Sequence, residues 1–272
     1  MNDQAQTFVI TRPLNQADSI ISSLKQHFAP SNSTLVSHLP LIKITSIKPQ
    51  MPLASSRFSG IIFISPNAVT HTANQLSKSE WKQLITSPLY AIGSRTSEVL
   101  KNICSDVLIQ TPDIQTPENM NSEGLLALST LSNVAQQRWL IVKGLGGREK
   151  LKDTLIQRGA EVVELCTYQR NIPDTKLSNR IRLALQIKSI WIITSVQAII
   201  NLAKIMSQTD QQIITQTAST ELKQLEINEN CRIIVSSDRI KESAIKLGFN
   251  VIAVAKNATD KQLIDCIKEL KL

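Results

Sequence analysis

The chain has 272 residues, of which 42% are hydrophobic and 4% aromatic, and 30 Lys and Arg against 22 Asp and Glu give a formal net charge of +8. This length suits two domains that each bury a core of their own. No apolar run approaches the roughly 20 residues that a membrane span requires, so we expect no membrane segment or membrane partner. The positive charge indicates an anionic partner but does not identify it.

The cysteines and the start of the chain bear on the compartment in which the protein works. Cys104, Cys166, Cys231 and Cys266 are scattered, without the spacing of a disulfide framework or of a metal site. Residues 1–6 are polar and lead straight into a predicted strand, so we expect neither a signal peptide nor a transit peptide. Both features favour a cytoplasmic protein with reduced thiols.

Predicted strands and helices alternate along the chain. The N-terminal part predicts strands at 8–11 and 35–38, a helix at 16–26, an extended segment at 40–44 and a proline-containing connector at 47–53. The middle part predicts strands at 60–64, 89–92, 139–142 and 161–163, with helices that begin near 66, 95, 122 and 148. A second extended connector at 164–170 precedes strands at 189–193, 231–235 and 251–254 and helices at 178–187, up to 206, at 217–225, up to 247 and from 260. This alternation predicts parallel sheets with helices on both faces.

The most informative pattern occurs once in each half of the chain. Residues 63–69 (FISPNAV) correspond to residues 193–199 (ITSVQAI), and each block follows an apolar strand and precedes a helical apolar period. Both are therefore strand-to-helix turns, at which Ser65 and Ser195 cap the helix and the first-turn amides can receive a carboxylate or a phosphate. Two such turns on similar half-molecules predict two facing lobes with a ligand between them.

A second pair of turns extends the repeat. Residues 90–98 (YAIGSRTSE) are another strand, turn and helix, and their counterpart at 233–242 (IIVSSDRIKE) aligns Gly93 with Ser237. The members of this pair lie farther apart than those of the first pair, so one half carries an insertion. We place the insertion most simply at residues 209–230.

A glycine turn follows the strand predicted at 139–142. Residues 144–148 (GLGGR) open a helix, but a dinucleotide-binding G-x-G-x-x-G would need glycine at Glu149, whose charge is wrong beside a pyrophosphate. We interpret the turn as a cradle for a carboxylate or another anion, to which Arg148 adds charge, or as a plain tight turn. No metal site is expected, because the histidines share no ligand spacing: His27, His38 and His71.

Several motifs recur in a fixed order over almost the whole chain. They are Thr11-Arg12-Pro13, Pro40-Leu41, residues 65–69 (SPNAV), 91–96 (AIGSRT), 122–126 (SEGLL), 143–148 (KGLGGR) and Tyr168-Gln169-Arg170, followed by 235–239 (VSSDR), Gly248 and 255–258 (AKNA). Each motif is weak alone, but the ordered set resembles uroporphyrinogen-III synthase in its proteobacterial form. The chain departs from that family at Lys143, where Arg is usual, and at Ser237 and Ile240, where many members have Gly and Thr.

The resemblance implies an α/β fold of two similar parallel-sheet domains, flavodoxin-like and three-layered, joined by a two-strand connector with the active-site cleft between them. We place the first, discontinuous domain at residues 1–40 and 172–272. The connector is expected at residues 41–51 and 164–171, and the second domain at 52–163.

The resemblance also implies the reaction. The family's substrate is hydroxymethylbilane, a linear tetrapyrrole polycarboxylate, and the enzyme inverts the last pyrrole and closes the macrocycle with loss of water. Departure of the terminal hydroxyl leaves an azafulvenium-like cation, which the substituted α-carbon of ring D attacks to give a spiro intermediate that fragments and recloses inverted. The protein must mainly hold a flexible polyanion in a curled shape. Helix N-termini and basic side chains suit that task without a metal or a cofactor.

The resemblance further assigns roles to individual residues. Tyr168 is the expected general acid, which protonates or steadies the departing hydroxyl, and a tyrosine that packs the connector is the alternative. Arg12 is expected to bind a propionate or an acetate, with a surface ion pair as the alternative. The expected substrate-binding residues are Arg12, Ser65, Asn67, Arg95, Thr96, Lys143, Gly144, Arg148, Ser195, Gln197 and Ser237. Asn67 and Gln197 fit a solvent-exposed first turn equally well.

Two other classes of protein share some of these sequence features with the enzyme. Nucleic-acid binding is compatible with the charge, but the basic residues are dispersed and only 3 Trp, 2 Tyr and 5 Phe are present to stack bases. A two-lobed, non-catalytic binding protein for an anionic small molecule would share the connectors and the turns, and it is the alternative function. We expect a monomeric enzyme without a nucleic-acid partner, in transient contact with the preceding enzyme of its pathway.

Overall fold

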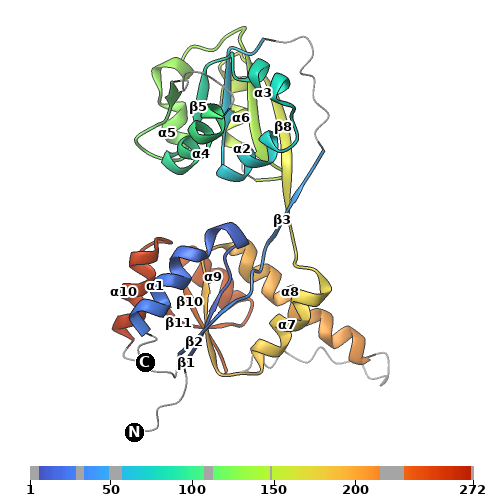
Figure 1. Cartoon of the computed structure of the whole chain (residues 1–272), viewed down its shortest axis with the longest axis vertical. Helices are drawn as coiled ribbons and strands as arrows, with labels where there is room; N and C mark the ends of the chain where they lie inside the picture. Colours follow the sequence, from blue (N-terminus) through green and yellow to red (C-terminus); the bar gives the residue numbers. More distant parts are fainter. Residues whose placement is uncertain are drawn as a thin grey trace. The chain divides into compact units, whose positions relative to one another are not determined.

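The computed structural model describes residues 6–28, 34–48, 57–106, 113–147, 149–214 and 230–270. The chain forms two compact units, Met1–Lys43 with Asn171–Leu272 (unit 1) and Ile44–Arg170 (unit 2). Each unit contains one sheet, and the strand pairs whose register is described are all parallel (Figure 1). The α/β class and the parallel sheets that the alternation predicted are confirmed.

The sheet of unit 1 has five strands. In spatial order they are β11 (Asn250–Val254), β10 (Cys231–Val235), β9 (Ser189–Ile193), β1 (Gln6–Ile10) and β2 (Thr34–His38). One face packs against α1 (Asp18–Phe28) and α10 (Asp260–Glu269), and a 3₁₀ turn, η1 (Leu14–Gln16), precedes α1. The helices α7 (Thr175–Leu185), α8 (Val196–Ile214) and α9 (Asp238–Lys246) pack together on the opposite face (Figure 1).

The sheet of unit 2 has six strands. In spatial order they are β3 (Lys43–Ser46), β8 (Glu161–Asn171), β7 (Arg138–Gly144), β4 (Gly60–Phe63), β5 (Leu89–Ala91) and β6 (Ile114–Gln115). One face packs against α2 (Pro66–Ala73), α3 (Lys78–Leu84) and α4 (Ser94–Ser105). The other face packs against α5 (Ser122–Leu126), η2 (Ser129–Leu131) and α6 (Lys150–Gln157).

Alternation of side chains along the strands builds a core on each face of the unit 2 sheet. Ile61 and Phe63 of β4 point into the core under α2, α3 and α4, whereas Ile62 between them joins the core under α5 and α6. All three side chains are fully buried. Because helices cover both faces of the sheet, the sequence of β4 is a continuous apolar run, as expected for a buried parallel sheet.

The two sheets have the same strand order when unit 2 is matched to unit 1 by circular permutation. The strands β4, β5 and β6 correspond to β9, β10 and β11, and β7 and β8 correspond to β1 and β2. With this correspondence the two sheets have the same spatial order of strands, and β3 is an extra edge strand in unit 2. This pairing equates β4 with β9 and β5 with β10, as the sequence repeat does. When the five strands of the unit 1 sheet are numbered by their position along the chain, their spatial order from the β2 edge is 2-1-3-4-5, which is the order of flavodoxin-like sheets.

Some elements differ from the prediction. The strand predicted at 161–163 and the connector predicted at 164–170 form one strand, β8, because pairing with β7 continues to the partners Gly144 and Tyr168. The helix predicted to end at 206 continues to Ile214. The helix predicted at 217–225, and the part of the predicted insertion from 215 to 229, lie outside the described residues. The strand β3 overlaps the extended segment predicted at 40–44, whereas the short elements α3 and β6 were not predicted.

One prediction concerns the close contact between β4 and β7. A Cβ atom at Gly60 would overlap with the indole ring of Trp139, which is 1% exposed. We expect Gly60→Ala to lower the free energy of unfolding by about 1–3 kcal/mol, because overpacking a dense core displaces its side chains. Urea unfolding followed by circular dichroism measures this change.

The neighbouring Ser59 is exposed and provides the control. Ser59→Ala should change the free energy of unfolding by no more than about 0.5 kcal/mol. Equal stability of Gly60→Ala and the parent protein would contradict the packing described for Trp139.

Candidate active site

Parallel pairing brings the carboxyl ends of the strands in each sheet to one edge, where ligands of open α/β sheets bind. In unit 2, the predicted site residues at this edge lie in or after four strands: Ser65 and Asn67 after β4, Arg95 and Thr96 after β5, Lys143 and Gly144 at the end of β7, and Tyr168 in β8 opposite Gly144. In unit 1, the corresponding residues follow three strands: Arg12 after β1, Ser195 and Gln197 after β9, and Ser237 after β10. Each set therefore lies at the carboxyl edge of its own sheet.

The two repeated serines cap their helices, as the sequence predicted. Ser65 Oγ accepts a hydrogen bond from the backbone N–H of Ala68 at 3.1 Å, with Pro66 in the first turn of α2. Ser195 Oγ accepts one from the N–H of Ala198 at 3.2 Å. These bonds satisfy amides that would otherwise lack a partner at the start of α2 and α8.

Tyr168 lies inside unit 2, with its hydroxyl at the N-terminus of α2. Its side chain is 1% exposed and packs in the core cluster under α2, α3 and α4. Its hydroxyl lies 3.0 Å from Ser65 Oγ and accepts a hydrogen bond of 2.9 Å from the Arg170 guanidinium. The Cζ atom of the Arg170 guanidinium lies 5.2 Å from the centroid of the Tyr168 ring. The phenol is thus held by a serine and a cation at once.

Gly144 makes room for the tyrosine ring. A Cβ atom at Gly144 would lie 2.5 Å from Tyr168 Cζ, so a side chain at this position would displace the ring. Gly144 pairs with Tyr168 after a register shift between β7 and β8, and the Leu145 N–H donates to the Tyr168 carbonyl at 2.8 Å. The glycine predicted as part of an anion cradle therefore also permits the close approach of β8.

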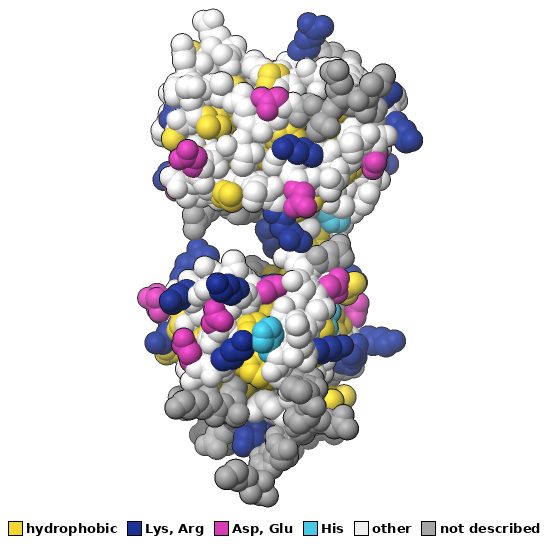
Figure 2. Space-filling model, turned by 60° about the vertical axis from the view of Figure 1, so that its left-hand side comes forward, with side chains coloured by type: hydrophobic (Ala, Val, Ile, Leu, Met, Phe, Trp, Pro, Cys, Tyr) yellow, Lys and Arg dark blue, Asp and Glu magenta, His cyan; other side chains and the backbone are white. Residues whose placement is uncertain are grey.

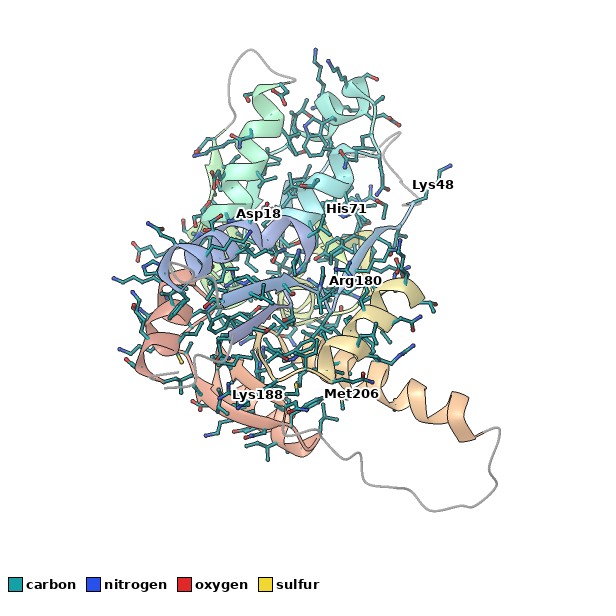
Figure 3. The ribbon with its side chains drawn as sticks, turned by 60° about the horizontal axis from the view of Figure 1, so that its bottom comes forward. Asp18, Lys48, His71, Arg180, Lys188 and Met206 are labelled. Carbon is teal, nitrogen blue, oxygen red and sulfur yellow. The ribbon has the colours of Figure 1, made fainter. Side chains whose placement is uncertain are left out.

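His71 lies on α2 (Figure 3), and its ring stacks against the Tyr168 ring. The ring centroids are 5.6 Å apart and the planes differ by 23°. His71 Nδ1 lies 2.8 Å from Ser46 Oγ, and burial lowers the pKa of His71 below its usual value. Neither His71 nor Arg170 is among the site residues predicted from the sequence, where His71 was named only as a histidine without metal-ligand spacing. A signal for Arg170 was its place in the Tyr168-Gln169-Arg170 motif.

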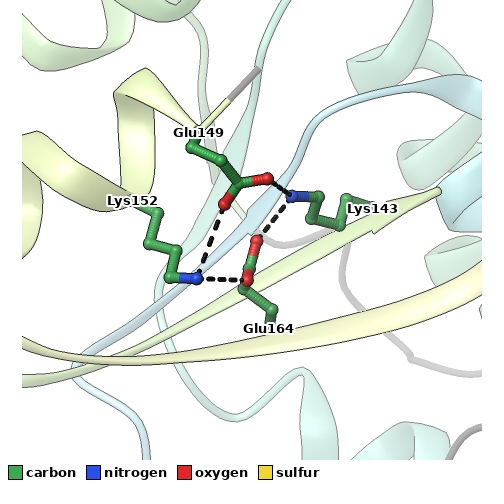
Figure 4. Close-up of polar contacts among 4 residues, drawn as sticks. All are labelled: Lys143, Glu149, Lys152 and Glu164. Atoms are coloured by element: carbon green, nitrogen blue, oxygen red, sulfur yellow. Dashed lines mark hydrogen bonds and ion pairs between the residues drawn. The ribbon is translucent and has the colours of Figure 1, made fainter. Parts of the chain in front are cut away.

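Lys143 lies in a network of four charges (Figure 4). Its Nζ bonds Glu164 at 2.5 Å and Glu149 at 3.0 Å, and Lys152 Nζ bonds Glu164 at 2.8 Å and Glu149 at 3.5 Å. Burial alone would lower the pKa of Lys143, but the hydrogen bonds and charges of the two glutamates raise it. Burial alone would raise the pKa of Glu164, but the two lysines lower it. The charge of Lys143 is therefore compensated within unit 2.

Arg12 forms the ion pair that was the alternative to substrate binding. Its guanidinium bonds Asp260 Oδ1 in the first turn of α10 at 2.5 Å and also donates to the carbonyl of Ala258. The Arg12 side chain is 12% exposed, and its backbone carbonyl bonds His38 Nε2 at 2.9 Å. These contacts fix the turn after β1 to the start of α10.

The other predicted residues differ in their surroundings. Arg95 is exposed and has no ion pair within the described part of the chain, whereas Thr96 beside it is 2% exposed. Gln197 is exposed, and its amide donates to Asn201 Oδ1 at 2.9 Å. Ser237 is the N-cap residue of α9 without a side-chain capping bond. Asn67 is half-buried in the first turn of α2, and Arg148 lies outside the described residues.

Two features are absent from the described residues. These residues contain no group of three or more His, Cys, Asp and Glu that could hold a metal ion. They also contain no helix with the length and hydropathy needed to cross a membrane. On the face shown in Figure 2, Lys and Arg side chains alternate with Asp and Glu and do not gather into one basic patch.

Solved structures share this fold. The chain is similar to a uroporphyrinogen-III synthetase from Helicobacter pylori, with a TM-score of 0.60, 16% identity and coverage of 97% of this chain and 99% of that chain. It is also similar to a mutant uroporphyrinogen III synthase from Thermus thermophilus, with a TM-score of 0.53, 13% identity and coverage of 98% and 99%. At these identities the likeness concerns the fold.

The chain is also similar in sequence to curated proteins and to a family model. A curated uroporphyrinogen-III synthase of Escherichia coli is 28% identical over 268 residues, which cover 96% of this chain and all of the relative. The enzyme of Proteus mirabilis is 36% identical over 140 residues, which cover 49% of this chain and 67% of the relative. The family model of uroporphyrinogen-III synthase HemD matches residues 31–265. The chain therefore belongs to the uroporphyrinogen-III synthase family.

Proposed function

We propose that this chain cyclises hydroxymethylbilane, with inversion of ring D and loss of water, to give uroporphyrinogen III in tetrapyrrole and haem biosynthesis. The observation that carries the proposal is the match to a curated uroporphyrinogen-III synthase along the whole of that relative. The enzyme is a cyclising lyase, and its substrate is a linear tetrapyrrole polycarboxylate. It acts in the cytoplasm as a monomer, without a cofactor, and contacts the preceding enzyme of the pathway transiently.

Helix N-termini at the carboxyl edges of the sheets suit a substrate with many carboxylates. α2 and α4 in unit 2, and α8 and α9 in unit 1, begin within a few residues of a strand end and direct their first amides toward that edge. A carboxylate bound there receives backbone hydrogen bonds in addition to the helix dipole. The side chains assigned to substrate remain Arg12, Ser65, Asn67, Arg95, Thr96, Lys143, Gly144, Arg148, Ser195, Gln197 and Ser237.

Turns of both units contact one substrate molecule in this proposal. The sequence repeat and the circularly permuted strand order supply each unit with an equivalent set of turns. Binding one flexible tetrapyrrole at both sets would fix its curled shape, which is the main task in the reaction. The proposed domains are 1–40 with 172–272 and 52–163, joined at 41–51 and 164–171, with the active-site cleft between them.

The basic residues divide into paired and unpaired charges. Lys143 and Arg12 are already bonded to carboxylates of the protein, so a substrate carboxylate would have to share or displace those partners. Arg95 is exposed at the start of α4 without an ion pair in the described residues. Arg95 is therefore the basic side chain best placed to receive a substrate carboxylate directly, and Lys143 mainly shapes the glycine turn.

The direct test is turnover. The protein is incubated with enzymatically generated hydroxymethylbilane, and the type I and type III uroporphyrinogen isomers are resolved by chromatography. The expected result is a protein-dependent excess of the type III isomer. Saturable binding of the bilane without formation of the type III isomer would instead identify a non-catalytic binding protein.

Removal of the phenol tests the general acid. We expect Tyr168→Phe to lower kcat by about one to two orders of magnitude, the low end for general acid catalysis, because the bilane also ionises spontaneously. The product should stay mostly the type III isomer, because inversion depends on how the substrate is folded. A parental rate would make Tyr168 a packing residue, and accumulation of the type I isomer at a normal rate would assign it to folding the substrate.

Removal of the unpaired charge tests substrate binding. Arg95→Ala should raise KM with little change in kcat, because the contact exists in the bound substrate as well as in the transition state. The effect should shrink with added salt, which screens exposed charges. Arg180, an exposed arginine in the middle of α7 (Figure 3), is the matched control, and Arg180→Ala should leave KM unchanged. An unchanged KM in Arg95→Ala would indicate that backbone amides hold the carboxylates.

Removal of the paired charge tests the network. Lys143→Met should lower the free energy of unfolding by about 2 kcal/mol, less than for a fully buried pair because both glutamates reach water. Since the pKa of Glu164 is lowered in the folded state, its contribution is complete above its unfolded pKa and is lost as the pH falls. The difference between parent and variant should therefore be largest at neutral pH and decrease in acid.

Lys150 on α6 is the matched control for this network. Its ion pair with Glu123 has a similar length, 2.8 Å, but both side chains are exposed. Lys150→Met should change the free energy of unfolding by no more than about 0.5 kcal/mol, both at neutral pH and in acid. Equal effects of the two substitutions would mean that the Lys143 network is no more stabilising than a surface pair.

A further inference from the structure

The burial of Tyr168 separates it from any ligand at the carboxyl edge. Its side chain is 1% exposed, and a proton on its hydroxyl has no direct route to a bound molecule. Ser65, whose Oγ lies 3.0 Å from the phenol oxygen, is half-buried and begins the helix at that edge. Ser65 is thus the more accessible member of a hydrogen-bonded pair whose other member, Tyr168, is buried.

The donors around the pair limit the directions of its hydrogen bonds. A guanidinium N–H can only donate, so the phenol oxygen accepts from Arg170. A backbone N–H can only donate, so Ser65 Oγ accepts from Ala68. When the phenol then donates its own proton to Ser65 Oγ, the serine hydroxyl proton has no described partner and is free to point to a ligand.

We propose that Ser65 gives the proton to the departing hydroxyl of the substrate and that Tyr168 resupplies Ser65 through their hydrogen bond. The inference rests on the proposed function. The carbon–oxygen bond of the terminal hydroxymethyl group breaks as its oxygen takes the serine proton and leaves as water. The serine oxygen takes the phenol proton, which leaves a phenolate and the azafulvenium-like cation of the substrate. The proton released when the macrocycle closes returns through Ser65 to the phenolate, so the cycle balances.

Two neighbours support the phenolate that this relay forms. The Arg170 guanidinium bonds the phenol oxygen at 2.9 Å, and a charge-assisted bond of this kind strengthens when the oxygen becomes negative. Gly144 lets the ring lie against the backbone of β7, which holds the hydroxyl beside the start of α2. The positive end of the α2 dipole lies at the same place and favours the negative charge.

The corresponding turn of unit 1 lacks the resupplying group. Ser195 caps α8 as Ser65 caps α2, with bonds of 3.2 and 3.1 Å to the helix amides. The chain has only two tyrosines, Tyr90 and Tyr168, and both belong to unit 2. The relay is therefore specific to one of the two repeated turns, and the other turn is left with a capping and binding role.

A double-mutant cycle tests the relay. Ser65→Ala, Tyr168→Phe and the double variant are compared with the parent for kcat, KM and the ratio of isomers. Because the two groups act in series, each single variant should lose about 10- to 100-fold in kcat and the double variant should lose no more than the larger single loss. KM should change little, and Ser65→Thr, which keeps both the hydroxyl and the cap, should restore most of kcat.

The control separates proton transfer from helix capping. Ser77 caps α3 in the same unit, where its Oγ accepts from the Glu80 N–H at 3.3 Å, and it has no place in the proposed site. Ser65→Ala and Ser77→Ala should each lower the midpoint of thermal unfolding by a few degrees, as loss of a helix cap does, but only Ser65→Ala should lower kcat. A smaller solvent deuterium isotope effect on kcat is expected in Ser65→Ala and Tyr168→Phe than in the parent.

The outcomes distinguish the relay from the function. If the parent protein forms no type III isomer, the proposed function fails and the relay fails with it. If the parent is active and Ser65→Ala turns over at the parental rate, only the relay is wrong. Losses that multiply in the double variant would also overturn it, because they would mean that Ser65 and Tyr168 act independently.

Discussion

Parallel pairing of the strands is the constraint on which the rest of the structure depends. In each sheet it brings the ends of strands that are distant in the chain to one edge, where the next helices begin. In unit 2 this edge unites the end of β4, the glycine turn after β7 and Tyr168 of β8, which come from three separate segments. Backbone hydrogen bonding therefore brings the residues of the candidate site together before any side chain contributes.

Close packing then gives this edge its chemistry. Because Gly144 has no side chain, the Tyr168 ring lies directly on the backbone of β7, and its hydroxyl reaches the cap of α2. His71 and Arg170 also contact the ring. In the proposed relay, a phenol fixed in this way needs no reorganisation to exchange a proton with Ser65, which is the advantage of a preorganised polar group over water.

The net charge of +8 overstates the free positive charge at the proposed site. Lys143 is shared by Glu149 and Glu164, and Arg12 is bonded to Asp260. Ion pairs of this type shape turns and leave little charge to attract a ligand. The N-termini of α2, α4 and α8, whose first turns contain no acidic residue, are better suited to bind the carboxylates of a tetrapyrrole.

The sequence by itself determined the alternation of strands and helices, the repeated turns and the capping roles of Ser65 and Ser195, because these depend on local periodicity and on the residue at a helix start. The ordered motifs likewise determined the family. Only the tertiary structure decided that Lys143 and Arg12 are paired, that Tyr168 is buried and that His71 and Arg170 contact its ring. It also revealed the circular permutation that relates the two sheets. These features depend on which distant strands pair and in what register, and no local pattern in the chain carries that information.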